Sequence, residues 1–244
     1  MNGMLAIMRR ELRSYFLTPV AYVFIVIFLV LTSTFTFYLG GFYERSQADL
    51  AAFFNFHPWL YLFLIPALSM RLWAEERKSG SIELLMTLPV DLWQAVVGKF
   101  LAAWAFTGLA LVLTFPIWIT VNYLGDPDNG AVVAAYIGSL LMAGGFLAVG
   151  SCISATTKNQ VIAFILAVVA CFLLLLAGFP LVLDMFSAWA PQMLIDAIAS
   201  LSFLTHFTSI SKGVIDLRDL VYFALLISVM LYANAIVLQI KKSD

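Results

Sequence analysis

Residues Glu75–Val90 read EERKSGSIELLMTLPV, and this charged stretch separates two long apolar runs of the chain. Gly80 permits a sharp turn, Ser81 is a favourable N-cap, and Glu83 lies in the first turn, where a negative charge complements the helix dipole. Pro89 lacks the N–H group that would continue the helix. The stretch therefore predicts a helix of about two turns, which is too short to be stable in water alone. Lipid headgroups and a groove on a soluble partner are the two candidate surfaces for it.

The chain around this stretch has the composition of a membrane protein. Hydrophobic residues make up 63% of it and charged residues only 11%, which excludes an ordinary soluble domain. Six runs without Asp, Glu, Lys or Arg each exceed the roughly 20 residues that a helix needs to cross a bilayer. They lack the short-range alternation of a transmembrane β-barrel. We predict an all-α integral membrane protein, a single domain over 1–244 with six transmembrane helices at 17–42, 53–73, 96–124, 131–156, 160–183 and 219–240.

Lys and Arg residues set the predicted orientation, because basic residues are held on the cytoplasmic side during insertion. A cytoplasmic N-terminus places ten of the 13 basic residues inside and three outside. With six spans, both termini are then cytoplasmic. The first apolar run is far longer than the apolar region of a signal peptide, so we expect an uncleaved first span.

Two further segments are predicted to lie at the membrane surfaces. Residues 1–16 have an amphipathic pattern, with Arg9, Arg10 and Arg13 away from the apolar face, and predict an interfacial helix. This helix is either a topology anchor or a contact with a cytoplasmic partner. Residues 184–218 are apolar but interrupted, and predict short external helices that re-enter the outer leaflet between spans five and six. A helix lying flat in the interface is the alternative.

Several functional classes are disfavoured by the residues. The Gly98-Lys99 pair lacks the rest of a phosphate-binding loop, so nothing here would hold a nucleotide. His57 and His206, expected near the outer face, lack the neighbours of a metalloprotease motif, and no nucleophile elbow occurs. A net charge of −1 gives no sign of nucleic-acid binding. A secondary transporter is the stronger rival, but its ionisable groups usually lie at mid-membrane, where these six runs carry none.

The loop and the topology together resemble those of ABC-2 type permeases. The acidic and basic turn, Gly-Ser, the acidic residue, Leu-Leu and the final Pro match the cytoplasmic signature that follows span two in this family. The stretch LTHFTSISKGVIDLRDLVYF before the sixth span also fits. Within the family, the chain is most similar to permeases of the gliding-motility-associated type, with the copper-centre assembly permeases as near relatives.

The resemblance implies a coupling helix within residues 75–92 that docks on an ATP-binding subunit. The residues implied in this docking are Glu75, Glu76, Arg77, Gly80, Ser81, Ile82, Glu83, Leu84, Leu85 and Pro89, with Arg9, Arg10 and Arg13 as further candidate contacts. The chain itself is expected to have no catalytic residue, metal site or cofactor, since ATP and Mg²⁺ belong to the partner. We expect two ATPase subunits, a second permease, identical or related, and a candidate periplasmic or lipoprotein accessory.

The predicted function is that of a permease subunit in the bacterial inner membrane, which couples ATP hydrolysis elsewhere to export or handling of a substrate. The alternative within the same class is a mechanotransmission complex that acts on a periplasmic or lipoprotein partner without passage of a solute. A secondary transporter that needs no partner is the alternative from another class. No cluster of residues in the sequence selects a substrate.

Overall fold

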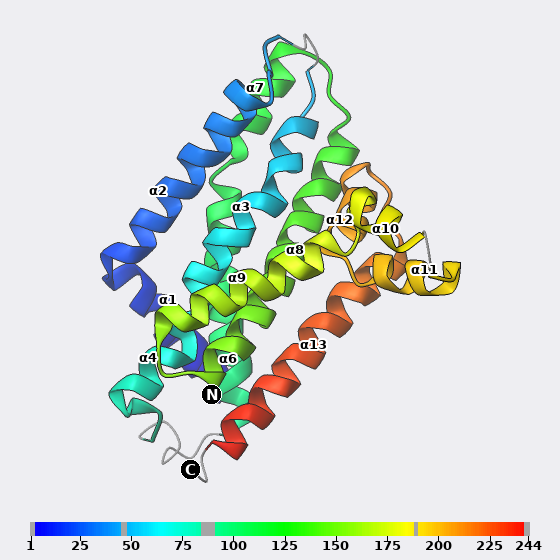
Figure 1. Cartoon of the computed structure of the whole chain (residues 1–244). Helices are drawn as coiled ribbons and strands as arrows, with labels where there is room; N and C mark the ends of the chain where they lie inside the picture. Colours follow the sequence, from blue (N-terminus) through cyan, green and yellow to red (C-terminus); the bar gives the residue numbers. More distant parts are fainter. Residues whose placement is uncertain (1–2, 45–47, 84–90, 188–189, 242–244) are drawn as a thin grey trace.

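The computed structural model describes residues 3–44, 48–83, 91–187 and 190–241 of the chain, and every regular element among them is helical (Figure 1). The first half contains α1 (Gly3–Leu17), α2 (Pro19–Thr34), the π-helical η1 (Phe35–Leu39), α3 (Ala51–Ser69), α4 (Arg71–Ser79), α6 (Leu92–Val112) and α7 (Phe115–Leu124). The second half contains α8 (Asn129–Thr156), α9 (Gln160–Leu176), α10 (Pro180–Ser187), α11 (Gln192–Ser200), α12 (Phe203–Ser211) and α13 (Leu217–Ile240). The prediction of an all-α membrane protein is confirmed.

Five helical segments are long and apolar enough to cross a membrane. They are 19–39, 51–79, 92–124, 129–156 and 217–240. The predicted fifth span, 160–183, contains the shorter α9 of 17 residues, which would be about 25 Å long. That helix ends at Leu176, and Pro180 begins α10 after a break that includes Gly178. The continuous fifth span that the sequence predicts is therefore divided in two.

Two of the long segments are also interrupted by short breaks. Val112 ends α6 and Phe115 begins α7, with Thr114 between them donating to the Leu111 carbonyl at 2.6 Å. Pro116 follows at the start of α7, where its missing N–H costs nothing. The second break separates α3 from α4 at Met70.

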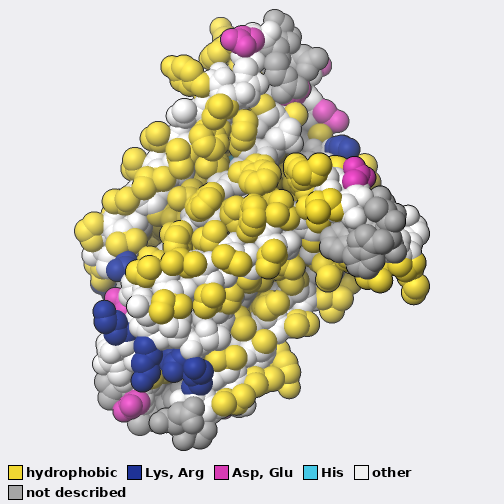
Figure 2. Space-filling model, viewed as in Figure 1, with side chains coloured by type: hydrophobic (Ala, Val, Ile, Leu, Met, Phe, Trp, Pro, Cys, Tyr) yellow, Lys and Arg dark blue, Asp and Glu magenta, His cyan; other side chains and the backbone are white. Residues whose placement is uncertain are grey.

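The bundle has two ends with different contents (Figure 1). We call the end that holds α1, α4 and the last turns of α8 and α13 the terminal end. The opposite end, which holds α7, the first turn of α8 and the short helices α10 to α12, is called the distal end. Figure 2 shows hydrophobic side chains over the middle of one face, with Lys and Arg gathered toward its lower left. This banding is what a bilayer-spanning protein requires.

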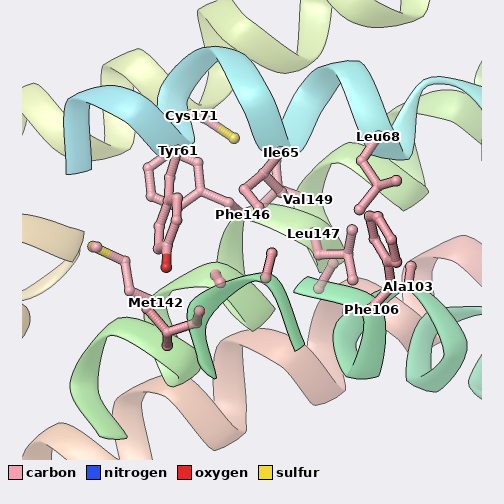
Figure 3. Packing of buried hydrophobic residues seen from close by; sticks show 14 of the residues in the cluster. Tyr61, Ile65, Leu68, Ala103, Phe106, Met142, Phe146, Leu147, Val149 and Cys171 are labelled. Carbon is pink, nitrogen blue, oxygen red and sulfur yellow. The ribbon is translucent and has the colours of Figure 1, made fainter. Parts of the chain in front are cut away.

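Helix α8 forms the centre of the bundle and packs against α3, α4, α6, α9, α12 and α13. Small residues allow this close approach, as a Cβ atom on Gly138 would lie 2.8 Å from Ile210 Cγ2, and one on Gly145 would lie 2.6 Å from Phe203 Cε1. Small residues at helix contacts are typical of membrane proteins, where close van der Waals packing drives association. Met142 and Phe146 of α8 lie in the same buried cluster as side chains of α3 and α6 (Figure 3).

The distal end contains three short helices, α10 to α12, and two of them lie within the segment 184–218 where the sequence predicts short external helices. Helix α10 takes up part of the predicted fifth span, and α11 and α12 follow with an angle of 71° between them. His206 of α12 is tied to α13, since its Nδ1 lies 2.6 Å from Asp219 Oδ1 and its ring stacks on Tyr222 with centroids 3.9 Å apart. The Tyr222 hydroxyl donates to the Leu201 carbonyl at 2.6 Å. These contacts fasten the short helices to the start of α13.

The other histidine, His57, lies inside the bundle and not at the end of an element. It is fully buried in α3, its Nδ1 is 3.1 Å from Ser139 Oγ of α8, and its ring stacks on Tyr61. Cys152 of α8 and Cys171 of α9 are both free thiols. No group of three or more His, Cys, Asp or Glu residues that could hold a metal ion occurs among the described residues.

Candidate functional site

Helix α4 leads into the charged loop and is held at its start by α8. The backbone N–H groups of Trp73 and Ala74 both donate to Ser154 Oγ at 3.1 Å, and that hydroxyl donates to the Met70 carbonyl at 2.9 Å. A helix start leaves backbone N–H groups without partners in the helix itself. Ser154 thus acts as a cap supplied by another helix. The Trp73 indole N–H adds a bond to Ser151 Oγ at 3.2 Å.

The end of α4 is fixed by Arg77 and Gly80. Arg77 Nη1 donates to the Ala155 carbonyl at 2.7 Å, in the last turn of α8, where carbonyl groups lack partners within the helix. Gly80 then has a φ of 74°, in the left-handed region that favours glycine. The sharp turn predicted at Gly80 is confirmed. The backbone N–H of Glu83 donates back to the Gly80 carbonyl at 3.1 Å.

A buried lysine joins three helices beside this turn. Lys99 of α6 has a side chain only 2% exposed, and its Nζ lies 2.8 Å from Glu76 Oε1 of α4 and 3.2 Å from Glu11 Oε1 of α1. Arg10 Nη2 lies 2.7 Å from the same Glu11 oxygen. The Lys99 ammonium also lies 5.2 Å from the centre of the Trp73 ring. A charge buried this deeply requires such partners.

The carboxyl group of Glu11 responds to this environment. Burial raises its pKa, but the Lys99 ammonium and the Arg10 guanidinium act in the opposite direction and hold the pKa of Glu11 below its usual value. The carboxylate is therefore ionised at neutral pH. It forms a cluster with a second acidic side chain, Glu76, and with two basic side chains, Arg10 and Lys99. We call these four residues the charge cluster.

Close packing holds α1 along α6 and supports the charge cluster. A Cβ atom on Gly98 would lie 2.9 Å from the Met4 carbonyl oxygen and 3.1 Å from Ile7 Cγ2. Tyr15 stacks on Phe106 with ring centroids 5.2 Å apart. The helix predicted over residues 1–16 is thus present, and its apolar side is used for packing within the chain.

The predicted coupling residues fall into three groups. Glu76 and Arg77 point to partners inside the chain, as do the Arg10 guanidinium and the partly buried Ile82. The exposed residues are Glu75, Gly80, Glu83, Arg9 and Arg13, and also Arg10, although it pairs with Glu11. Ser81 is half-buried, with its hydroxyl 2.9 Å from that of Ser79. Leu84, Leu85 and Pro89 lie outside the described residues. The structure thus separates exposed positions from those that hold the fold.

Sequence reasoning missed the two residues at the centre of the charge cluster, Glu11 and Lys99. Lys99 opens the apolar run of the third span, and a lysine directly before about 20 apolar residues is a signal for a buried or snorkelling charge. Glu11 is the one acid among the first 43 residues. Its place beside three arginines was the available signal for an ion pair.

A cleft of about 430 Å³ opens beside the charge cluster, between α1, α4 and α6. The charged residues that line it are three basic ones, Arg10, Arg71 and Lys99, and three acidic ones, Glu11, Glu75 and Glu76. Hydroxyl groups of Ser14, Tyr15 and Thr18 complete its polar wall. Arg71 and Glu75 form their own ion pair, with Nε and Oε2 3.5 Å apart.

The long apolar helices and the charged turn are those of a multi-pass membrane protein. The family model that describes the ABC-2 family transporter proteins matches this chain over residues 5–240. The chain therefore belongs to this family of membrane transport components.

Local similarity to curated proteins falls on two heme exporter B proteins. The protein of Rhodobacter capsulatus is 39% identical over 70 residues, which are 28% of this chain and 32% of that protein. The protein of Paracoccus denitrificans is 36% identical over 80 residues, 32% of this chain and 37% of that protein. The chain thus matches about a third of the length of each relative. The narrower likeness to the gliding-motility-associated type stays a prediction.

Proposed function

We propose that the chain is the permease subunit of an ATP-driven transporter of the bacterial inner membrane. Six spans, with α9 as the fifth, place both termini and the terminal end of the bundle in the cytoplasm. Two separate ATPase subunits bind ATP and Mg²⁺, and a second permease completes the membrane part. The proposal is supported by membership of the ABC-2 family and by the banding of basic residues toward one end.

The observation that carries the proposal is the attachment of α4. This helix ends at the exposed turn around Gly80, and it is joined to α8 through Ser154 and Arg77 and to α1 and α6 through Lys99. A push on the turn by a docked subunit would therefore reach three other helices of the bundle through short contacts. A surface loop with contacts only to its neighbours would yield without transmitting the motion.

In this mechanism, closure of the ATPase dimer moves the coupling segment 75–92, and α4 passes the displacement to the ends of α3 and α6. Glu75, Gly80, Ser81 and Glu83 form the described part of the docking surface, with Ile82 packed behind them. Leu84, Leu85 and Pro89 complete it by the family resemblance. Arg9 and Arg13 are exposed on α1 and extend the same surface.

Export of a cargo is the form of the function to test first. Heme is the first cargo to assay, because both curated relatives are named heme exporter protein B. The alternative is mechanotransmission to a periplasmic or lipoprotein partner, in which ATP hydrolysis is stimulated but nothing crosses the membrane.

The test compares two variants of the turn with a matched charge reversal elsewhere. Glu83→Arg and Gly80→Val are expected to abolish stimulation of the co-expressed ATPase subunit, since one reverses an exposed charge and the other forces a β-branched residue to a φ of 74°. Asp126→Arg, at an exposed distal position, is the control and is expected to leave stimulation unchanged.

Normal stimulation and normal transport in both turn variants would remove the turn from the mechanism. Purification of the chain without any ATPase, with transport by the chain alone, would favour a secondary transporter.

A further inference from the structure

The cleft between α1, α4 and α6 has the chemistry of a binding site for a zwitterion. Its lining carries three basic and three acidic side chains, namely Arg10, Arg71, Lys99, Glu11, Glu75 and Glu76. Guanidinium groups are the side chains best suited to phosphate, because their N–H donors match its oxygens in pairs. Carboxylates accept from an ammonium group. A ligand with a single negative charge would meet as much repulsion as attraction here, whereas one with both charges has partners for each.

Glu76, which lines this cleft, has one carboxylate oxygen without a donor among the described residues. Glu76 Oε1 receives Lys99 at 2.8 Å, but Glu76 Oε2 is buried and has no hydrogen-bond partner among the residues that the structure describes. A buried carboxylate oxygen without a donor is unfavourable. A primary ammonium, with three N–H donors, would satisfy this oxygen and still reach the neighbouring Glu75 carboxylate.

The place of the cleft indicates where such a ligand comes from. Thr18 lines it and directly precedes Pro19, the first residue of the first candidate span, while Arg71 lines it at the point where α3 gives way to α4. The cleft thus lies at the level where the apolar part of the bundle ends and lipid headgroups begin. Leu17 is 75% exposed and Val23 is 55% exposed beside it. An acyl chain leaving the cleft would find an apolar helix surface to lie along.

From these observations we propose that the cleft binds the headgroup of an inner-leaflet phospholipid with a phosphate and a primary ammonium, the chemistry of phosphatidylethanolamine. Arg71 and Arg10 hold the phosphate, assisted by the Ser14 hydroxyl. Glu75 and Glu76 hold the ammonium. The volume of about 430 Å³ is within the range of small-molecule sites, roughly 300–1,000 Å³. A lipid seated there would contact α1 and α4 together, beside the charge cluster.

The test uses the full chain, purified and delipidated in detergent, without any ATPase subunit. Its melting temperature and its lipid adducts in native mass spectrometry are measured with four additives: phosphatidylethanolamine, phosphatidylcholine, phosphatidylglycerol and soluble phosphoethanolamine. We expect phosphatidylethanolamine to give the largest shift and one retained lipid per chain. Phosphatidylcholine has no N–H donor on its nitrogen and phosphatidylglycerol has no ammonium, so both should bind about tenfold more weakly.

Variants locate the effect in the cleft. Arg71→Gln and Glu75→Gln change half-exposed or exposed side chains, so both should fold, and both should lose the preference for phosphatidylethanolamine. Arg13→Gln is the matched control, an exposed arginine of α1 that does not line the cleft, and should keep the preference.

Three results would overturn the proposal. Equal shifts with all three lipids would indicate general contact with the bilayer. A shift with soluble phosphoethanolamine equal to that with the lipid would indicate a soluble ligand. Preference retained in Arg71→Gln and Glu75→Gln would place the lipid elsewhere. All three results are independent of the proposed coupling function.

Discussion

The terminal and distal ends of the bundle use buried polar groups in different ways. At the terminal end, polar contacts join segments far apart in the chain, such as Arg77 with Ala155, separated by 78 residues, and Ser154 with Met70, separated by 84. At the distal end, His206 and Asp219 are separated by 13 residues, and Tyr222 and Leu201 by 21. The terminal end is thus one cross-linked body, whereas the polar contacts of the distal end fasten short helices to their neighbours.

This difference fits different mechanical tasks. A cross-linked body moves as a unit when one part is pushed, which suits the end proposed to receive force from an ATPase. Short helices tied locally can shift against the rest at lower cost, which suits an end where a path would open or a partner would be contacted. Changes at the terminal end should therefore affect coupling and stability together, and changes at the distal end stability alone.

Removal of Lys99 should have the largest effect. In Lys99→Met, two carboxylates remain buried without their central cation, and breaking a buried charge network in this way costs about 3–5 kcal/mol. We expect a large fall in melting temperature in detergent and loss of ATPase stimulation.

Two controls sharpen the Lys99 experiment. Lys78→Met removes an exposed lysine of α4 and should change the melting temperature little. Adding Glu11→Gln and Glu76→Gln to Lys99→Met removes the unpaired charges and should restore much of the stability. Equal effects of Lys99→Met and Lys78→Met would show that the charge cluster does not hold the terminal end together.

At the distal end, removal of Asp219 should have an intermediate effect on stability. Asp219 is 6% exposed and faces His206 Nδ1 at 2.6 Å, and a hydrogen bond to a charged group is worth about 1.5–3 kcal/mol. Asp219→Ala should lower the melting temperature and leave ATPase stimulation per folded molecule unchanged. Asp196→Ala, at an exposed position of α11, is the matched control and should do neither. Loss of stimulation in Asp219→Ala would contradict the division between the two ends.

The sequence predicted the features that depend on local pattern. Apolar length identified five of the six predicted spans, and Gly80 identified the turn that its positive φ confirms. These signals act through the backbone of a few residues, so no tertiary information is needed.

The charge cluster depends on tertiary structure and could not be read in the same way. Glu11, Glu76 and Lys99 meet only because α1 packs on α6 through Gly98 and because α4 is held on α8 by Ser154 and Arg77. The sequence placed Glu76 and Arg77 on an outward-facing loop, since it could not show that α4 begins before them and rests on α8. Likewise, His57 looked interfacial because its partner Ser139 lies on a distant segment.

Removal of the Ser154 cap should have a smaller effect on stability than on coupling. Ser154→Ala leaves two backbone N–H groups of α4 without an acceptor, and loss of a helix cap costs about 0.5–2 kcal/mol. Since the same change frees the start of α4 from α8, ATPase stimulation should fall by more than the fraction of unfolded protein explains. Ser228→Ala, an exposed serine of α13 that bonds within its own helix, should leave both quantities unchanged. Stimulation that follows the folded fraction alone would give Ser154 a purely structural role.

The smallest expected effect is a pH dependence confined to the terminal end. The ordinary pKa of Glu11 is 4.5, and in the folded protein it is lower because of Lys99 and Arg10, despite burial, which acts to raise it. Ionised Glu11 therefore contributes stability that is fully present above about pH 4.5 and is lost as the pH falls through the lower folded value. Melting temperatures measured between pH 3 and pH 6 should fall at the acid end in the unmodified protein and fall less in Glu11→Gln. The exposed distal Asp126→Asn should reproduce the unmodified curve. If the melting temperature of Glu11→Gln fell with pH as steeply as that of the unmodified protein, the acid sensitivity would arise elsewhere. The cross-linking of the terminal end would then depend on Lys99 and Glu76 and not on Glu11.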